Sequence, residues 1–568
     1  MISIVKNIFK EINPWYNIRI MHTNIRADIL AGITVAIIAL PMALAFGDLA
    51  FGDLVPGIGP IAGVWGAIVG GIIGGLFGGC MVGVSGPTSP KALQIAGVML
   101  IFTQMFEITN REEILGVAFT MIFLSGLILV IISMLKISRF IHYTPYPVIG
   151  GFMCGIGVIV IFTQINAFLG LDKGQSFTEH IYNTNINALY VSVPSLLILF
   201  LWDPFKNKIQ FLSKIPSPLI ALIVGTSIAY FMDLNIAKIS GQGMNNTDGN
   251  IFNFYLPNLN HAFNLIGPAF SLAALAVLDS LLSCKVADNM TGTRHSSDRE
   301  TFGQGMANIA AGLLGGVTTA TATMRTVGNI KFGAKTPLAS IVHGLTLLAI
   351  LLGLSSLIGQ IPMACLAAIL IKVGIDIMDY RILSILNKIP IPDMLIFIVV
   401  LFFTAYFPHK LTMAVGVGVI LALLISFKYI LLIWKSNYTN KIVPLSDSDF
   451  QLKGQKENNE PPINVLQLEG PLFFGSIVSL MKIYNAAPKH KLLIIDMTSV
   501  TMVDLSGIYT LEDIIKVAKN KNIEVFVVNA KSHIKEKLEK LDFIENIGKD
   551  NYKDSKESIM PIISNINF

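Results

Sequence analysis

The chain has 568 residues, of which 53% are hydrophobic and only 14% are charged. Ordinary soluble domains carry roughly a quarter charged residues, so this composition is that of a membrane protein. A formal net charge of +5 is too small for a nucleic-acid-binding protein of this length, and the Lys and Arg residues lie in short clusters between apolar segments.

The first segment, residues 1–27, opens with MISIVKNIFKEINPWYN, in which apolar residues recur at helical spacing. It lacks an uninterrupted apolar core followed by a small-residue cleavage site. The pattern predicts a surface helix on the cytosolic side rather than a signal peptide.

Residues 28–434 are dominated by apolar segments. A helix that crosses hydrocarbon about 30 Å thick needs about 20 residues. Besides the spans of that length, two apolar segments, after residues 85–90 and 318–325, are unusually short. Counting both short segments predicts about fourteen membrane elements. The candidate spans begin near Ile29, Ile58, Leu115, Val148, Leu189, Pro218, Leu265, Gly303, Leu338, Ile361, Ile391 and Met413.

The basic residues of the loops predict the orientation of these spans. Loops such as 235–260 and 353–360 are poor in Lys and Arg, whereas the alternating loops hold the basic clusters. This alternation predicts an even number of crossings with both termini in the cytosol. The expected location is the plasma membrane (bacterial inner membrane). The clusters contain Lys6, Lys10, Arg19, Arg26, Lys136, Arg139, Lys206, Lys208, Lys214, Lys285, Arg294, Arg299, Lys428, Lys435 and Lys441.

Small residues mark the first two spans. Gly66, Gly70 and Gly74 recur every four residues, a pattern that lets helix backbones approach closely in lipid. The preceding AFGDLAFGDL is a tandem duplication, and its Asp48 and Asp53 are expected to face water at the membrane edge. The four cysteines lie in or beside apolar segments without paired spacing and are interpreted as packing residues: Cys80, Cys154, Cys284 and Cys365.

The two short elements occupy corresponding places in the two halves of the membrane region. Each is opened by small and hydroxyl residues that interrupt a helix, SGPTSP at 85–90 and TTATATMR at 318–325. Broken helices at matching positions indicate the central site of a transporter, where the positive ends of half-helices bind an anion. The candidate anion-binding residues are Ser85, Gly86, Thr88, Ser89, Ala322, Thr323 and Arg325. The alternative is that Pro87 and Pro90 only kink a helix while Arg325 reaches the membrane surface.

Asp279 lies inside the apolar segment LAALAVLDSLLSC. An ionised carboxylate within a span is costly unless it has a partner, and such residues are functional by default. Ser283 follows one helical turn later, so the pair could hold a small cation or relay protons. In the structural alternative, Asp279 pairs with a neighbouring helix.

After Trp434, a polar linker at 435–462 leads into a small soluble α/β domain at 463–568. Buried strands are predicted at 465–468, 492–496 and 525–529, with helices at about 511–519 and 531–541. The chain shows neither a phosphate-binding loop nor a catalytic arrangement of His residues, so it is expected to be driven by gradients and not to be an enzyme.

These segments resemble the SulP (sulfate permease) family of anion transporters over nearly the whole chain. The matching blocks are LAGITVAIIALPMALAFG (30–47), VSGPTSP (84–90), LDSLLSCKVADNMTGTRHSSDRE (278–300), GQGMANIAAGLLGG (303–316) and ATMRTVGNIKFGAKTPLA (322–339). The resemblance implies an all-α membrane domain of seven plus seven inverted repeats with core and gate parts, usually as a homodimer. The sequence of this chain departs from the family pattern at TTATATMR, where family members often have PGAGATMR.

Within this family, the patterns at 40–47 and 279–288 are most similar to the sodium-dependent bicarbonate branch. That resemblance implies a sodium ion held by Asp279, Ser283, Thr321 and Thr323, with no other cofactor. The function it implies is sodium-coupled bicarbonate symport. Proton-coupled uptake of sulfate or a dicarboxylate, a passive anion channel and a membrane-anchored signalling protein are the alternatives.

The C-terminal domain resembles STAS domains through GPLFFGS (470–476) and IDMTSVTMVDLSG (495–507). In bacterial anti-sigma antagonists, the Ser of the matching turn is a phosphorylation site, and Ser506 occupies that position here. The resemblance favours a scaffold role, with a cytosolic regulator as a partner of the domain.

Overall fold

The computed structural model describes residues 13–52, 54–55, 57–171, 184–206, 215–239, 254–435, 438–448, 450, 463–477 and 480–565. Residues 1–12 of the predicted surface helix, Asp53 and residues 451–462 of the predicted linker lie outside this range. The chain divides into two compact units. The first comprises Met1–Ile141, Cys154–Met378 and Phe403–Met413, and the second comprises His142–Met153, Asp379–Phe402 and Ala414–Phe568.

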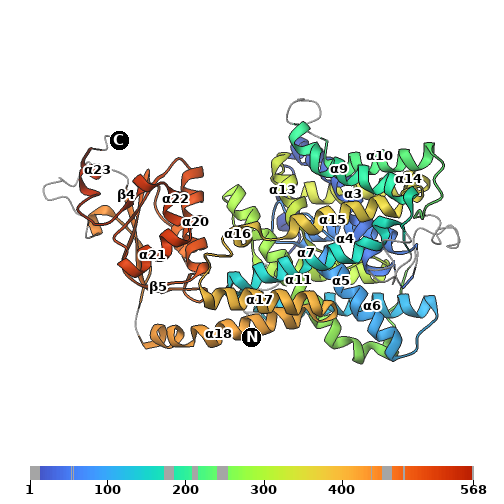
Figure 1. The fold of residues 1–568 in the computed structure, drawn as a ribbon, viewed down its shortest axis with the longest axis horizontal. Coiled ribbons are helices and arrows are strands. Elements are labelled where there is room, and N and C mark those ends of the chain that lie inside the picture. Colours follow the sequence, from blue (N-terminus) through green and yellow to red (C-terminus); the bar gives the residue numbers. More distant parts are fainter. Residues whose placement is uncertain are drawn as a thin grey trace. The chain divides into compact units, whose positions relative to one another are not determined.

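Helices make up most of the chain up to residue 435 (Figure 1). They are α2 (Trp15–Met21), α3 (Ile25–Phe51), α4 (Gly59–Phe77), α5 (Ser89–Met105), α6 (Arg111–Met134), α7 (Tyr146–Leu169), α9 (Ile186–Lys206), α10 (Ser217–Phe231), α11 (Ala262–Thr291), α12 (Ser297–Leu313), α13 (Thr323–Lys331), α14 (Leu338–Gly359), α15 (Met363–Ile377), α16 (Tyr380–Leu383), α17 (Ile391–Tyr406) and α18 (Leu411–Lys435). Short 3-10 helices lie at η1 (Ile137–Tyr143), η5 (Leu259–His261) and η6 (Pro408–Lys410).

The predicted membrane elements are confirmed by these helices. Each predicted span begins close to the start of an observed helix, and the two short elements appear as α5 and the nine-residue α13. In the described part of the chain, six helices are long and apolar enough to cross a membrane: α3, α4, α6, α7, α11 and α18. The pattern was readable because apolar span length is a local property of the sequence.

The glycines of α4 allow close backbone contact, as predicted. A Cβ at Gly66 would lie 2.4 Å from the carbonyl oxygen of Val317, and one at Gly74 would lie 2.8 Å from Ser85 Oγ. On another face of the helix, a Cβ at Gly71 would lie 2.9 Å from the carbonyl oxygen of Ser340 in α14. The small residues therefore bring two different segments against α4 at once.

The described part of the predicted surface helix is α2. Asn17 is fully buried and donates to the carbonyl oxygens of Gly75, Leu76 and Gly78, each at 3.0 Å, at the C-terminal end of α4. Trp15 and Tyr16 of the same helix are exposed. Asn17 therefore satisfies carbonyl groups at the C-terminal end of α4, while the aromatic side chains of α2 stay exposed.

The expectation for Asp48 was wrong. Because α3 continues to Phe51, the first copy of the duplication is helical, and Asp48 is only 6% exposed instead of facing water. Close packing between Gly47 and Gly59 places this end of α3 against α4. All four cysteines are buried, and none of them forms a disulfide bond.

The C-terminal domain contains a five-stranded sheet in the order β3-β4-β5-β6-β7. Its strands are β3 (Lys441–Pro444), β4 (Ile463–Leu472), β5 (Leu492–Val503), β6 (Glu524–Val528) and β7 (Tyr552–Lys553), and its helices are α19 (Leu480–Asn485), α20 (Leu505–Asn520), α21 (Ser532–Lys540), α22 (Phe543–Ile547) and α23 (Met560–Asn565), with η7 (Leu445–Asp447) and η9 (Lys549–Asn551). Only the β3–β4 pair is antiparallel.

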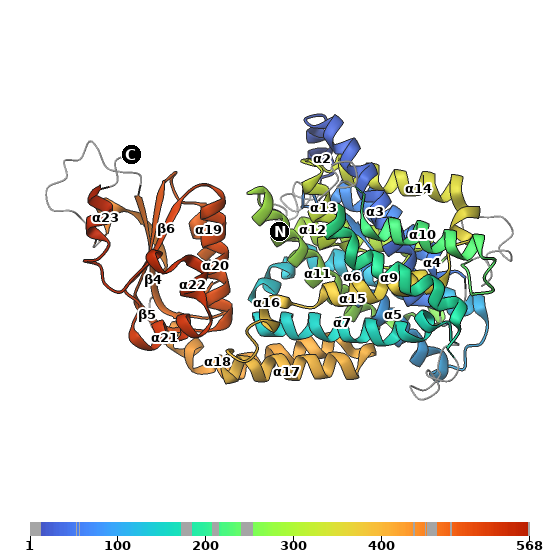
Figure 2. The ribbon, with the colours of Figure 1, turned by 45° about the horizontal axis from the view of Figure 1, so that its top comes forward.

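Alternation along the strands builds a core on each face of this sheet. Residues such as Val465, Ile494 and Val528 pack with Ile559 and Ile563 on the face covered by α23. Figure 2 shows α19, α20 and α22 on the opposite side of the strands. The predicted strands and helices are confirmed, and β3 begins the sheet within the segment that the sequence assigns to the linker.

Candidate functional site

The two interrupted segments of the membrane region pair directly with each other. Ser85–Gly86 (β1) and Ala320–Thr321 (β2) form a short antiparallel ribbon, with Ser85 opposite Thr321 and Gly86 opposite Ala320. Non-helical backbone survives at membrane depth only where its polar groups are satisfied by protein or line a cavity. The ribbon meets this requirement and joins the two halves of the sequence at one place.

A half-helix begins directly after each strand of this ribbon. Helix α5 starts at Ser89 and α13 at Thr323, and neither N-cap residue, Thr88 or Ala322, caps its helix with a side chain. The Ala322 amide itself donates to the carbonyl oxygen of Val84 at 3.0 Å. The Ser89 hydroxyl is buried without a hydrogen-bond partner. Two positive helix ends therefore start from one ribbon, the arrangement that favours an anion.

Helix α11 connects the two half-helices through hydroxyl groups. The Thr88 hydroxyl donates to Asp279 Oδ2 at 2.5 Å. One turn later, Ser283 Oγ donates to the Asp279 carbonyl oxygen at 2.9 Å and lies 2.8 Å from Thr323 Oγ1. The structure thus brings four of the predicted site residues together along one helix face.

Arg325 is held inside the protein instead of reaching the membrane surface. It is 2% exposed, and its Nη2 donates to the Pro87 carbonyl oxygen at 3.0 Å. Its Nη1 has no hydrogen-bond partner, and a Cβ added to Gly86 would lie only 1.9 Å from that atom. The absence of a side chain at Gly86 therefore makes room for the guanidinium across the ribbon.

Lys91 is a charged residue of this region that the sequence analysis did not select. It lies in the first turn of α5, is fully buried, and its Nζ has no hydrogen-bond partner. It lies three residues after Thr88, the N-cap residue of α5 whose hydroxyl donates to Asp279 Oδ2. The signal was available, because an ionisable residue directly after Pro90 in an apolar membrane helix is functional by default.

Thr321 belongs to a second buried network behind the ribbon. Its hydroxyl donates to Glu300 Oε1 and accepts from Gln304 Nε2 at 2.9 Å. The same Gln304 nitrogen donates to Ser85 Oγ at 2.7 Å. Glu300 also accepts from the backbone N–H groups of Gly79 and Cys80 at 2.8 and 2.9 Å. Thr321 and Ser85 are therefore tied to Glu300 and Gln304, whereas Thr323 faces Ser283.

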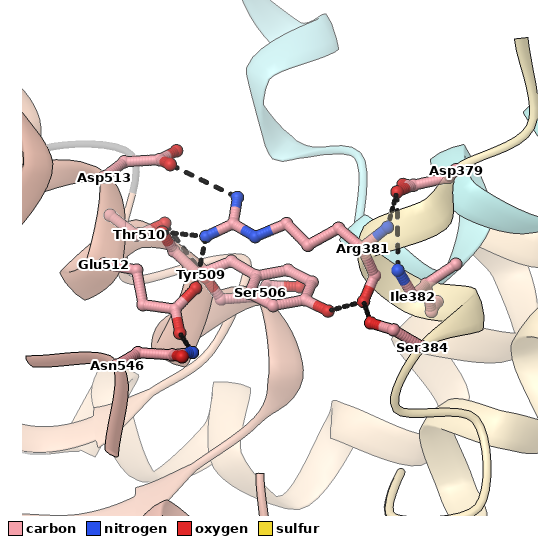
Figure 3. A network of polar contacts seen from close by, with 10 residues as sticks. All are labelled: Asp379, Arg381, Ile382, Ser384, Ser506, Tyr509, Thr510, Glu512, Asp513 and Asn546. Atoms are coloured by element: carbon pink, nitrogen blue, oxygen red, sulfur yellow. Dashed lines mark hydrogen bonds and ion pairs between the residues drawn. The ribbon is translucent and has the colours of Figure 1, made fainter. Parts of the chain in front are cut away.

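In the second unit, Arg381 is the centre of a polar network between α16 and α20 (Figure 3). Its guanidinium donates to Glu512 at 2.5 Å and to Asp513 at 3.2 Å, and it lies 3.8 Å from the centroid of the Tyr509 ring. The Tyr509 hydroxyl donates to the Arg381 carbonyl oxygen at 2.9 Å. Although burial opposes the charge, Asp513 and Glu512 raise the pKa of Arg381. Two charged bonds and a stacked ring fix α16 against the C-terminal domain within this unit.

Ser506 lies in the first turn of α20, close to this network. It is 5% exposed, and its Oγ accepts from the backbone N–H of Tyr146 at 3.0 Å. The preceding Asp504 caps the helix by accepting from Gly507 N–H at 2.7 Å. Burial, and then the charge of Asp393, raise the pKa of Asp504 to about 8. The predicted regulatory serine is thus engaged in a contact that a phosphate would displace.

Similarity to known proteins agrees with this architecture. The sulfate permease family model matches residues 25–400, and the STAS domain model matches residues 456–558. The bicarbonate transporter BicA of Picosynechococcus sp. is 32% identical, with 95% of each chain covered. The putative sulfate transporter YvdB of Bacillus subtilis is 29% identical and covers 94% of this chain and 96% of its own.

Solved structures show the same membrane fold. The transmembrane domain of a cyanobacterial bicarbonate transporter BicA superposes with a TM-score of 0.60 at 31% identity, covering 69% of this chain and 97% of that one. SLC26A9, at 19% identity, superposes with a TM-score of 0.61 over 96% of this chain and 91% of its own, and it supports the fold alone. With a family model matched over residues 25–400 and a relative 32% identical over nearly its full length, this chain belongs to the sulfate permease family, with a STAS domain at its C-terminal end.

Proposed function

We propose that this chain is a secondary active transporter of small inorganic anions, with bicarbonate as the first substrate to test. The sulfate permease family is a family of membrane transporters. The observation that carries the proposal is the ribbon of β1 and β2, from which two half-helices start beside the buried Arg325. Bicarbonate is placed first because the relatives named BicA are bicarbonate transporters. Sulfate is second because YvdB is named a putative sulfate transporter.

In this proposal, the anion lies between the N-terminal ends of α5 and α13. Backbone amides of both half-helices and neighbouring hydroxyls would donate to it, while Arg325 supplies a full positive charge at short range. The proposed anion-binding residues are Ser85, Gly86, Thr88, Ser89, Ala322, Thr323 and Arg325. Because Arg325 already donates to the Pro87 carbonyl oxygen, its role is mainly electrostatic.

The proposed coupling site is Asp279. The sequence predicts sodium as the coupling ion, and Asp279, Ser283 and Thr323 offer oxygen atoms along one face of α11 that suit a hard cation. The remaining predicted ligand, Thr321, bonds to Glu300 and Gln304. The proton is the second candidate, and the buried Lys91 is the observation that favours it over sodium.

The wider setting of the proposal follows the sequence predictions. The transporter resides in a bacterial plasma membrane as a homodimer, with both termini in the cytosol. The STAS domain acts as a scaffold and as a docking point for a cytosolic regulator, with Ser506 as the candidate regulatory position.

Uptake into proteoliposomes tests this function. Purified protein is reconstituted, and uptake of radiolabelled bicarbonate, sulfate and a dicarboxylate is measured under sodium and proton gradients applied separately. The expected result is gradient-driven accumulation of bicarbonate, which Arg325→Ala reduces by raising the apparent KM. Uptake that only dissipates an existing anion gradient would instead establish a passive channel, and no uptake of any of these anions would contradict the proposal.

A further inference from the structure

The position of Lys91 is unfavourable for an ammonium group in every respect but one. The side chain is fully buried, and its Nζ has no hydrogen-bond partner. It lies in the first turn of α5, where the positive end of the helix dipole repels a cation. Arg325 adds a second positive charge to the same surroundings, because it donates to the Pro87 carbonyl oxygen just before α5 begins. Among the charged groups of the described residues, the carboxylate of Asp279 is the one that favours the charge of Lys91, because it accepts from Thr88 at the start of the same helix.

The same carboxylate is the group that would hold a sodium ion. Asp279 Oδ2 already accepts from the Thr88 hydroxyl, and the backbone carbonyl oxygen of Asp279 accepts from the Ser283 hydroxyl. A metal cation added here would be a third positive charge beside Lys91 and Arg325. Asp279 provides one negative charge against the two positive side chains, so repulsion would oppose the metal. Taken together, Lys91, Arg325 and Asp279 leave one positive charge in excess, which attracts an anion without any bound metal.

We propose that the Lys91 ammonium takes the place of a metal cation beside Asp279, so that sodium is not a coupling ion of this transporter. A cation tethered to α5 offsets the charge of Asp279 without having to bind and leave, whereas a sodium ion would offset it only when bound. The commitment of the Thr321 hydroxyl to Glu300 and Gln304 removes one of the predicted sodium ligands and agrees with this assignment. The inference rests on the proposed transport function but concerns only its coupling ion.

Equilibrium binding of radioactive sodium to the purified protein in nanodiscs tests the inference without requiring transport. The wild-type protein is expected to show no saturable sodium binding. Lys91→Met replaces the lysine by an unbranched apolar side chain of similar size and should create saturable binding, which Asp279→Asn in the same protein should abolish. The matched control is Lys331→Met, the same substitution at an exposed lysine of α13, which should leave sodium binding absent.

Two results would overturn the inference. One is saturable sodium binding by the wild-type protein that Asp279→Asn removes, a result that decides the question even where Lys91→Met does not assemble. The other is a folded Lys91→Met protein, with the melting temperature of the wild type, that binds no sodium.

Transport measurements separate this inference from the function on which it rests. Replacing external sodium by N-methylglucamine should leave wild-type anion uptake unchanged. The same replacement should lower anion uptake by Lys91→Met at least about tenfold, as expected when a bound sodium ion that contributes about 1.4 kcal/mol or more is lost. Absence of anion uptake in every ionic condition would refute the proposed function and would leave the sodium-binding result to judge Lys91 independently.

Discussion

Substitution of Gly86 by Ala is predicted to impair anion binding by displacing Arg325. An alanine Cβ at this position would lie 1.9 Å from Arg325 Nη1 and 2.9 Å from Cζ, distances that non-bonded atoms cannot keep. The next nearest atom to this Cβ is the Cα of Ala67 at 3.4 Å, so the backbone of α4 limits movement of the ribbon away from Arg325. Because the guanidinium is 2% exposed, it has no solvent into which to swing.

The expected magnitude comes from the attraction between Arg325 and the anion, which the displacement weakens. Arg325 Nη2 donates to the Pro87 carbonyl oxygen at 3.0 Å. This bond fixes the guanidinium, and moving a unit charge from about 4 Å to about 6–8 Å from the anion weakens their attraction by about 1.4–2 kcal/mol at an effective dielectric constant of about 20. Since each 1.4 kcal/mol is about a tenfold change in affinity, the apparent KM for the anion should rise by about tenfold to thirtyfold.

The assay is the concentration dependence of anion uptake in proteoliposomes, with melting temperatures to verify folding. Gly116→Ala is the matched control, because a Cβ at Gly116 in α6 has nothing within 4 Å. Arg325→Lys should retain much of the activity, since lysine keeps the charge. Gly86→Ala combined with Arg325→Lys should then behave like Arg325→Lys alone, because lysine has no atom in the place of Nη1.

An apparent KM for Gly86→Ala within twofold of the wild type would refute this reasoning. Full additivity of Gly86→Ala and Arg325→Lys would refute it as well, because additive effects show that the alanine acts elsewhere than on the guanidinium.

Three further predictions concern the coupling site and the second unit. Asp279→Asn should abolish accumulation of the anion in proteoliposomes while the protein still folds, since the amide keeps the shape and removes the charge; normal accumulation would exclude the coupling role. Arg381→Ala should speed hydrogen–deuterium exchange of the α16 and α20 amides at least about tenfold. Lys388→Ala removes one partly exposed ion pair worth about 0–1 kcal/mol and should change this exchange little. Equal effects of the two substitutions would refute a special role for the arginine. The pKa of Asp504 is raised to about 8, so the folded protein holds a proton that the unfolded chain releases at about pH 4. Stability should therefore fall as pH rises between these values, and Asp504→Asn should flatten the profile of melting temperature against pH there. An unchanged profile would contradict the raised pKa.

Local patterns of the sequence were sufficient for the elements of the fold. The length of each apolar segment predicted where the membrane helices begin, and strand-length apolar runs predicted β4, β5 and β6. The interrupted segments SGPTSP and TTATATMR were recognisable because proline and clustered hydroxyl residues disfavour a continuous helix wherever they occur. These properties depend on neighbouring residues, so no knowledge of tertiary contacts was required.

The identity of the partners depended on the three-dimensional structure. Thr321 and Thr323 are two residues apart and were assigned to the same cation, yet Thr321 bonds to Glu300 and Gln304 while Thr323 faces Ser283. The sequence pattern predicts Asp48 at a membrane edge, whereas in the structure α3 continues to Phe51 and Asp48 is buried. The two threonines point to different surroundings, and Asp48 is buried because its helix continues; both outcomes depend on contacts that the neighbouring residues do not set.

The sequence by itself therefore determined the membrane class, the positions of the helices, the α/β nature of the C-terminal domain and the two segments that open the half-helices. Only the tertiary structure decided that β1 pairs with β2, that Arg325 lies against Gly86, and that Asp279 bonds to Thr88 at the start of the helix that carries Lys91. The physical reason is that helix length and interruption arise from local periodicity and backbone preference, whereas a charge is stabilised by groups that are distant in sequence and close in space.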